Sequence, residues 1–110
     1  MVVSYTDAFK RQLQRLGRKY RHIRTDIQPF ITRLEAGETP GDHLQGLKHT
    51  LYKVRVKNSD AKRGKSGGYR IIYYLRTSEH TLLVAIYSKT EQSDIDSSEL
   101  AEILRKEDET

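Results

Sequence analysis

The chain has no cysteine, which excludes disulfides, thiolate metal sites and a thiol nucleophile. It has no apolar run approaching the length of a membrane span, and its first residues lack the apolar core of a signal peptide. Its four histidines and its carboxylates show no recognisable metal-ligand spacing. We therefore expect a cytoplasmic protein that uses neither a metal nor another cofactor.

Positive charge is what the chain has in excess. Twenty Lys and Arg residues against fifteen Asp and Glu give a net charge of +5, which favours nucleic acid or another polyanion as the partner. Many basic domains are merely soluble, so charge alone does not identify the ligand. A length of 110 residues predicts a single domain, 1–110, with one modest core.

The N-terminal third of the chain carries a helical pattern. Apolar residues recur at steps of three and four over residues 9–34, the spacing of an amphipathic helix. Gly17 lies within this stripe, so we expect a hairpin of two helices, at about 7–16 and 19–35, rather than one long rod. Residues 2–5 form a candidate first strand.

After a loop rich in Gly and Pro, the pattern changes to the alternation typical of strands. We expect strands at about 50–57, 69–76 and 81–88, antiparallel because their connections are short. The last one, TLLVAIY, is apolar nearly throughout and should be covered on both faces. Asp96 opens the sequence DSSE, which resembles a capping box and predicts a C-terminal helix.

These elements predict an α+β fold class. The expected architecture is an antiparallel sheet of about four strands with an N-terminal helical hairpin and a C-terminal helix. The order along the chain is β-α-α-β-β-β-α.

The most informative segment is residues 53–70, which hold seven of the twenty cations and a single acid, Asp60. Lys53, Arg55 and Lys57 alternate with apolar residues on the predicted strand, so they share one face. If the helical hairpin covers the apolar face, this row of cations stays open.

Other side chains extend the open face. Arg70 begins the next strand, Tyr87 lies near the end of the last strand, and Lys89 follows it. Lys and Arg neutralise phosphates, and Tyr rings stack on unpaired bases. With the Gly-rich basic loop KRGKSGG beside it, the face is suited to a nucleic acid.

Such a face also has the groups that metal-free RNA cleavage requires: a base for the 2′-OH, an acid for the leaving 5′-oxygen, and a cation for the charge on phosphorus. A Lys among other cations has a lowered pKa and can transfer a proton near neutral pH. Arg binds phosphoryl oxygens in a bidentate manner. From the residues alone, a face that only binds RNA is the simpler interpretation. His43 and His49 are a less favoured acid–base pair.

Three segments, LYKVRV, KRGKSGGYRIIYYL and LLVAIYSKTEQSDI, resemble RelE/ParE-superfamily toxins in order and spacing, and most of all the HigB-type branch of the RelE-like mRNA interferases. The resemblance covers nearly the whole domain. It implies a toxin of a type II toxin–antitoxin system, a metal-independent endoribonuclease that cuts translated mRNA in the ribosomal A site and stops translation. The implied partners are the ribosome with its mRNA and a cognate antitoxin, expected to be a helix-turn-helix DNA-binding protein.

The resemblance also implies roles for particular residues. The positions that match the basic site of the family are Lys53, Arg55, Arg70 and Lys89. Arg70 would stabilise the transition-state charge, and one lysine would transfer a proton. The family's aromatic near the last helix is replaced here by Asp96, so Tyr87 or Tyr73 would take its place. The residues expected to bind RNA or the ribosome are Lys57, Lys62, Arg63, Lys65 and Tyr73.

Two other functions are compatible with the sequence. One is a ParE-like toxin that inhibits gyrase on the same fold without nuclease chemistry. The other is a non-catalytic RNA- or ribosome-binding module. ParE-type chains generally lack such a dense basic sheet and loop, which favours RNA cleavage over gyrase inhibition.

Overall fold

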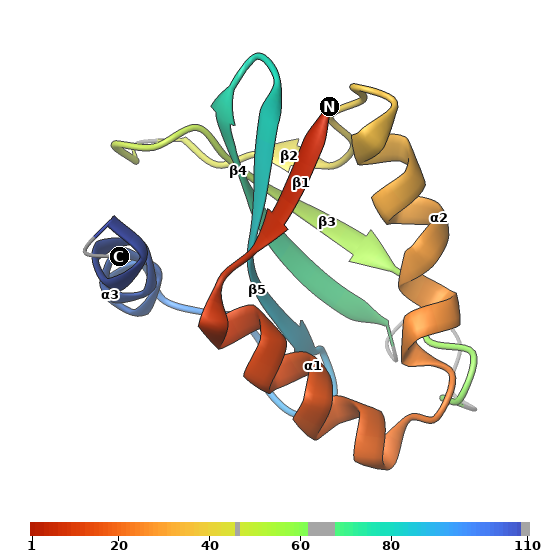
Figure 1. Ribbon diagram of the computed structural model, residues 1–110. Coiled ribbons are helices and arrows are strands. Elements are labelled where there is room, and N and C mark those ends of the chain that lie inside the picture. The colour runs from red at the N-terminus through yellow and green to blue at the C-terminus, as the bar shows by residue number, and fades with distance from the viewer. Residues whose placement is uncertain (46, 62–67, 109–110) are drawn as a thin grey trace.

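The computed structural model describes residues 1–45, 47–61 and 68–108. A five-stranded sheet forms the centre, with two helices packed on one face and the third on the other (Figure 1). The helices are α1 (Asp7–Lys19), α2 (Ile23–Glu35) and α3 (Ser97–Asp108). The strands are β1 (Val2–Tyr5), β2 (Asp42–His43), β3 (Leu51–Val56), β4 (Tyr69–Thr77) and β5 (His80–Ser88). The predicted α+β class, helical hairpin and final helix are confirmed.

The sheet is mixed rather than antiparallel. Its order is β1-β5-β4-β3-β2, with β1 parallel to β5 and the other described neighbours antiparallel. The expectation of about four antiparallel strands therefore needs two corrections. The chain passes from β1 directly into a helix, so β1 has no hairpin partner and pairs with the free edge of β5. β2 has two residues, too few for an alternating pattern in the sequence.

The break between α1 and α2 lies later than expected. Gly17 is inside α1, and a methyl group in its place would lie 3.8 Å from Ile23 Cγ2, an ordinary contact. The helix ends only where Tyr20 takes an extended conformation, with φ of −119°. One interior glycine costs a helix about 1 kcal/mol relative to alanine. Burial of Phe9 and Leu16 in the core offsets that cost.

Asp60, the acid within the basic segment, ties the chain after β3 to the start of α2. One of its carboxylate oxygens accepts a hydrogen bond from the His22 N–H at 2.8 Å, and the other lies 2.7 Å from His22 Nδ1. Asp26 in turn accepts bonds from the N–H and the hydroxyl of Ser59, at 2.9 and 3.0 Å. These contacts hold the end of β3 against the helical hairpin.

β5 is buried on both faces, as its sequence predicts. Leu83 packs in the cluster formed with α1 and α2, whereas Leu82 packs in the cluster that includes α3. Val54 and Val56 of β3 also pack toward α1 and α2. The apolar face of β3 is therefore the face that the hairpin covers, and its cations lie on the side of α3.

α3 begins at the predicted cap. Asp96 Oδ1 accepts hydrogen bonds from the Glu99 N–H at 2.8 Å and from the Ser98 hydroxyl at 2.6 Å. Neither α3 nor another helix of the described ranges is long and apolar enough to cross a membrane.

Candidate active site

Arg55, Arg70 and Tyr87 lie side by side across three strands. Arg55 of β3 is directly opposite Arg70 of β4, which is opposite Tyr87 of β5. Residues paired in this way have Cβ atoms about 4.5–5.5 Å apart and point to the same face. Lys53, two residues before Arg55, shares that face. We call Lys53, Arg55 and Arg70 the basic cluster.

The basic cluster concentrates positive charge on one face of the sheet. Like charges directly opposite on neighbouring strands are destabilising. Arg55 is exposed, and Arg70 and Lys53 are half-buried, so the cluster is open to an approaching ligand. Adjacent cations on a partly desolvated surface raise the local positive potential and attract anions. The geometry therefore favours binding of phosphate.

Gly68 brings the backbone close to both arginines. A Cβ at this position would lie 2.9 Å from the Val56 carbonyl oxygen, 3.4 Å from Arg70 Nη1 and 3.8 Å from Arg55 Cγ. Real Cβ atoms essentially never lie within 3.0 Å of another heavy atom in this way. A larger residue at position 68 would therefore displace the backbone at the end of β3. The sequence feature GGYR thus has a local reason: glycine leaves room beside the basic cluster.

Asp94 joins the site, although no sequence motif singled it out. Its Oδ1 atom lies 3.2 Å from Lys53 Nζ and accepts a hydrogen bond from the Tyr87 hydroxyl at 3.0 Å. The same oxygen accepts the N–H of Ile95 at 2.9 Å. The Ile95 N–H is the main cause that holds the pKa of Asp94 below its usual value, with Lys53 and Tyr87 adding to it. In the sequence, Asp94 is the penultimate residue of LLVAIYSKTEQSDI, and no pattern there predicted its contact with Lys53.

Tyr87 has a buried ring and a hydroxyl that contacts Asp94. Burial raises the pKa of Tyr87 to about 12, and the hydrogen bond and negative charge of Asp94 act in the same direction. Arg70 opposes this shift. The phenol is protonated at neutral pH, like an ordinary tyrosine, and can donate a hydrogen bond, while the shift makes it a weaker acid.

Lys89 and Lys57 lie at the ends of the paired strands. The N–H of Lys89 donates to the Gly68 carbonyl at 3.1 Å, and its ammonium group donates to the Ser93 carbonyl. This places Lys89 next to the start of β4, beside the basic cluster.

Lys57 follows the last residue of β3 and is exposed. It lines a cleft of about 400 Å³ between α2 and β3, together with Arg55 and Phe30. Lys57 therefore lies toward α2, which corrects the expectation that it shares the open face with Lys53.

The structure places Tyr73 away from the site, which corrects its expected role in RNA binding. Its side chain is fully buried on the face covered by α1 and α2. Its hydroxyl donates to the Pro40 carbonyl, and its ring stacks on Tyr52 at a centroid distance of 5.2 Å. Burial raises the pKa of Tyr73 above its ordinary value. Two tyrosines in succession, 73 and 74, point to opposite faces, and only the strand register decides which one is covered.

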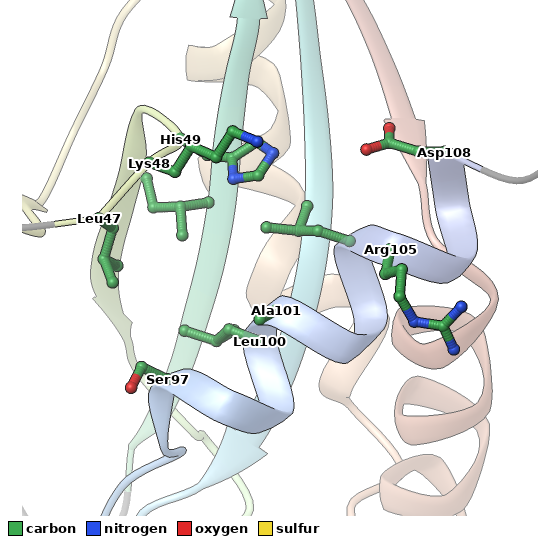
Figure 2. A pocket seen from close by; sticks show the side chains of 10 residues that line it. Leu47, Lys48, His49, Ser97, Leu100, Ala101, Arg105 and Asp108 are labelled. Carbon is green, nitrogen blue, oxygen red and sulfur yellow. The ribbon is translucent and has the colours of Figure 1, made fainter.

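The histidines do not form a catalytic pair. His43 packs on Tyr52 at 5.3 Å, whereas His49 packs on Tyr74 at 5.0 Å. Tyr52 and Tyr74 belong to the clusters on opposite faces of the sheet. His49 instead lines a mostly apolar pocket of about 300 Å³ at α3. Figure 2 shows it facing the helix residues, among them Leu100.

Of the remaining expected residues, Lys62, Arg63 and Lys65 lie outside the described ranges. Within those ranges, no three carboxylate or imidazole groups come together as a metal site would require. The chemistry available to the described site is that of ammonium, guanidinium, phenol and carboxylate groups.

One comparison with known proteins gives a match over nearly the whole chain. The model of a protein family described as "RelE toxin of RelE / RelB toxin-antitoxin system" matches residues 7–108. The match begins with α1 and ends with α3, so it includes every described strand of the site.

Proposed function

Because the chain belongs to the RelE family of toxins from toxin–antitoxin systems, we propose that it is a ribosome-dependent endoribonuclease of the HigB-type branch. It cleaves mRNA in the ribosomal A site and thereby inhibits translation. The observation that carries the proposal is the pair Arg55 and Arg70, two like charges directly opposite on an open sheet face. Such a pair concentrates positive charge at one point of the face and fits the two non-bridging oxygens of a phosphodiester.

The proposed reaction is an internal transphosphorylation. The 2′-oxygen attacks the adjacent phosphorus, so an O2′–P bond forms while the P–O5′ bond breaks. The proton of the 2′-OH passes to a base, and a proton from an acid reaches the leaving 5′-oxygen. The products are a 2′,3′-cyclic phosphate and a free 5′-OH. Negative charge accumulates on the phosphoryl oxygens in the transition state, where fixed cations stabilise it most.

Each residue of the site has a proposed part in this reaction. Arg70, held by β4 between Arg55 and Tyr87, stabilises the transition-state charge, and Arg55 binds the same phosphate. Lys53 transfers a proton. Tyr87 donates its one proton to Asp94 in the free protein and is proposed to donate to the phosphate or the leaving oxygen when RNA is bound. Lys89 binds the neighbouring phosphate.

Binding to the ribosome is proposed to use cations outside this centre. Lys57 is exposed beyond β3, and Lys62, Arg63 and Lys65 follow in the basic loop. The high density of charge there suits the phosphate backbone of ribosomal RNA or mRNA. With the ribosome as target, the proposed location is the cytoplasm.

A toxin of this family has an antitoxin partner. We propose that this partner is a helix-turn-helix DNA-binding protein and that it neutralises the toxin with an acidic or amphipathic segment. Such a segment would cover the basic cluster or displace α3. Leu100 and Leu104 of α3 line an apolar pocket that the segment could enter.

Cleavage in a reconstituted translation system tests the proposal. Primer extension on a translated mRNA should show new 5′ ends within codons only when ribosomes and the protein are both present. Inhibition of gyrase with intact mRNA would support a ParE-like toxin instead. Protein that binds ribosomes but never cuts mRNA would be a binding module, and the nuclease proposal would fail.

A further inference from the structure

The segment between β5 and α3 places one carboxylate inside the basic site. Asp94 Oδ1 is contacted by Lys53 Nζ at 3.2 Å, by the Tyr87 hydroxyl at 3.0 Å and by the Ile95 N–H at 2.9 Å. These donors come from β3, from β5 and from the segment itself. A single oxygen thus joins the two strands that flank Arg70.

The segment is held in place without these contacts. Near its start, Glu91 pairs with Arg15 and Lys19 of α1, at 3.0 and 3.5 Å. At its end, Asp96 caps α3. The ion pair between Lys53 and Asp94 is largely solvated, because the Asp94 side chain is 62% exposed, and such pairs add little to stability. The ion pair with Lys53 therefore calls for a reason other than folding, whereas the bond from Tyr87 also satisfies a half-buried hydroxyl.

We propose that Asp94 is a positioning residue of the nuclease site, which holds the Lys53 ammonium group and the Tyr87 hydroxyl at one point so that both act on the same phosphodiester. This inference rests on the proposed function. A free lysine side chain populates many rotamers, and fixing it in one of them before the substrate binds removes part of that entropic cost from the reaction. Asp94 likewise fixes the direction of the Tyr87 hydroxyl through its hydrogen bond at 3.0 Å.

The test compares Asp94→Asn and Asp94→Glu with a matched control, Glu91→Gln. Asp94→Asn and Glu91→Gln change the net charge by the same amount in the same segment, but Glu91 pairs with α1 and not with the site. Single-turnover cleavage on programmed ribosomes should slow in Asp94→Asn by up to about 100-fold, the effect of misplacing a reacting group by about 1 Å. The protein concentration for half-maximal rate should stay unchanged. Asp94→Glu keeps the charge and should recover part of the rate, and Glu91→Gln should match the wild type.

Two further measurements separate positioning from loss of structure. Titration of the Tyr87 phenol by ¹³C NMR, assigned with Tyr87→Phe, should give a lower pKa in Asp94→Asn than in the wild type. In a Lys53→Met background, Asp94→Asn should slow cleavage much less than it does alone, because residues that act through one another are not additive. A residue that only supports the fold would slow both backgrounds equally and lower the melting temperature.

The outcomes distinguish this inference from the proposed function. A wild-type protein that leaves mRNA intact on ribosomes would overturn the function itself. An active wild type with an equally active Asp94→Asn variant would overturn only the role of Asp94. Faster cleavage by Asp94→Asn would also overturn it, because the carboxylate would then be a competitor of the substrate phosphate for Lys53.

Discussion

Arg55 and Arg70 face each other across β3 and β4, with Tyr87 next in the same row on β5. Two guanidinium groups in cross-strand positions can bind one phosphate between them. Arg55 and Arg70 lie outside the two apolar clusters of the sheet, whereas Tyr87 belongs to one of them. Substitution of either arginine can therefore change cleavage with little effect on stability.

Replacement of Arg70 should remove cleavage without destabilising the fold. We expect Arg70→Ala to give no detectable mRNA breaks in primer extension, while removal of the repulsion from Arg55 leaves the free energy of unfolding unchanged or raises it by up to about 1 kcal/mol. The matched control is Arg76→Ala, on the same strand, where the arginine pairs with Asp108 at 3.3 Å on the surface. This variant should cleave normally, and normal cleavage by Arg70→Ala would refute the site.

Removal of the Tyr87 hydroxyl should affect chemistry more than binding. Tyr87→Phe keeps the buried ring but loses the hydrogen bond to Asp94, at a cost of about 1.5 kcal/mol in unfolding free energy. Single-turnover cleavage should slow, and the affinity for ribosomes should stay the same. Tyr73→Phe is the comparison, because it loses a buried hydrogen bond to the Pro40 carbonyl on the opposite face. It should lower the melting temperature yet cleave at the normal rate below that temperature.

Ribosome binding should weaken steeply with salt. Release of counterions makes the logarithm of the binding constant fall linearly with the logarithm of the salt concentration. Replacing Lys62, Arg63 and Lys65 by Gln should reduce that slope by about 1 for each phosphate that the protein no longer neutralises. Binding curves over a series of salt concentrations measure this slope. If the triple variant had the wild-type slope, the basic loop would have no part in docking.

The contact between Asp60 and His22 should make stability depend on pH in the acidic range. Hydrogen bonds from the His22 side chain and backbone lower the pKa of Asp60 below its ordinary 3.8. A carboxyl group whose pKa is lower in the folded state stabilises the fold above 3.8, and this contribution disappears as the pH falls through the folded value. Asp60→Asn should therefore be less stable than the wild type at neutral pH in urea unfolding. The difference should shrink as the pH falls below 3.8, and a constant difference would show that the Asp60 charge has no part in it.

Several features of the protein follow from local sequence alone. The steps of three and four in the N-terminal third predict the helical hairpin, and the alternation around Lys53 and Arg55 predicts an open basic face. DSSE predicts the start of α3 at Asp96, and the cap is present. Each of these signals lies within a few residues of the element it specifies, because helices and strands impose their own periodicity on the chain.

The tertiary structure decided what depends on residues far apart in the sequence. β1 pairs with β5 across the whole chain, and no local pattern encodes that partner. Register placed Tyr73 on the face covered by α1 and α2 and Tyr87 on the face of the basic cluster, although both are buried strand tyrosines. Asp94 meets Lys53 because the segment after β5 returns over the sheet. Periodicity assigns a side chain to a face, but only the packing of distant strands determines which side chains meet there.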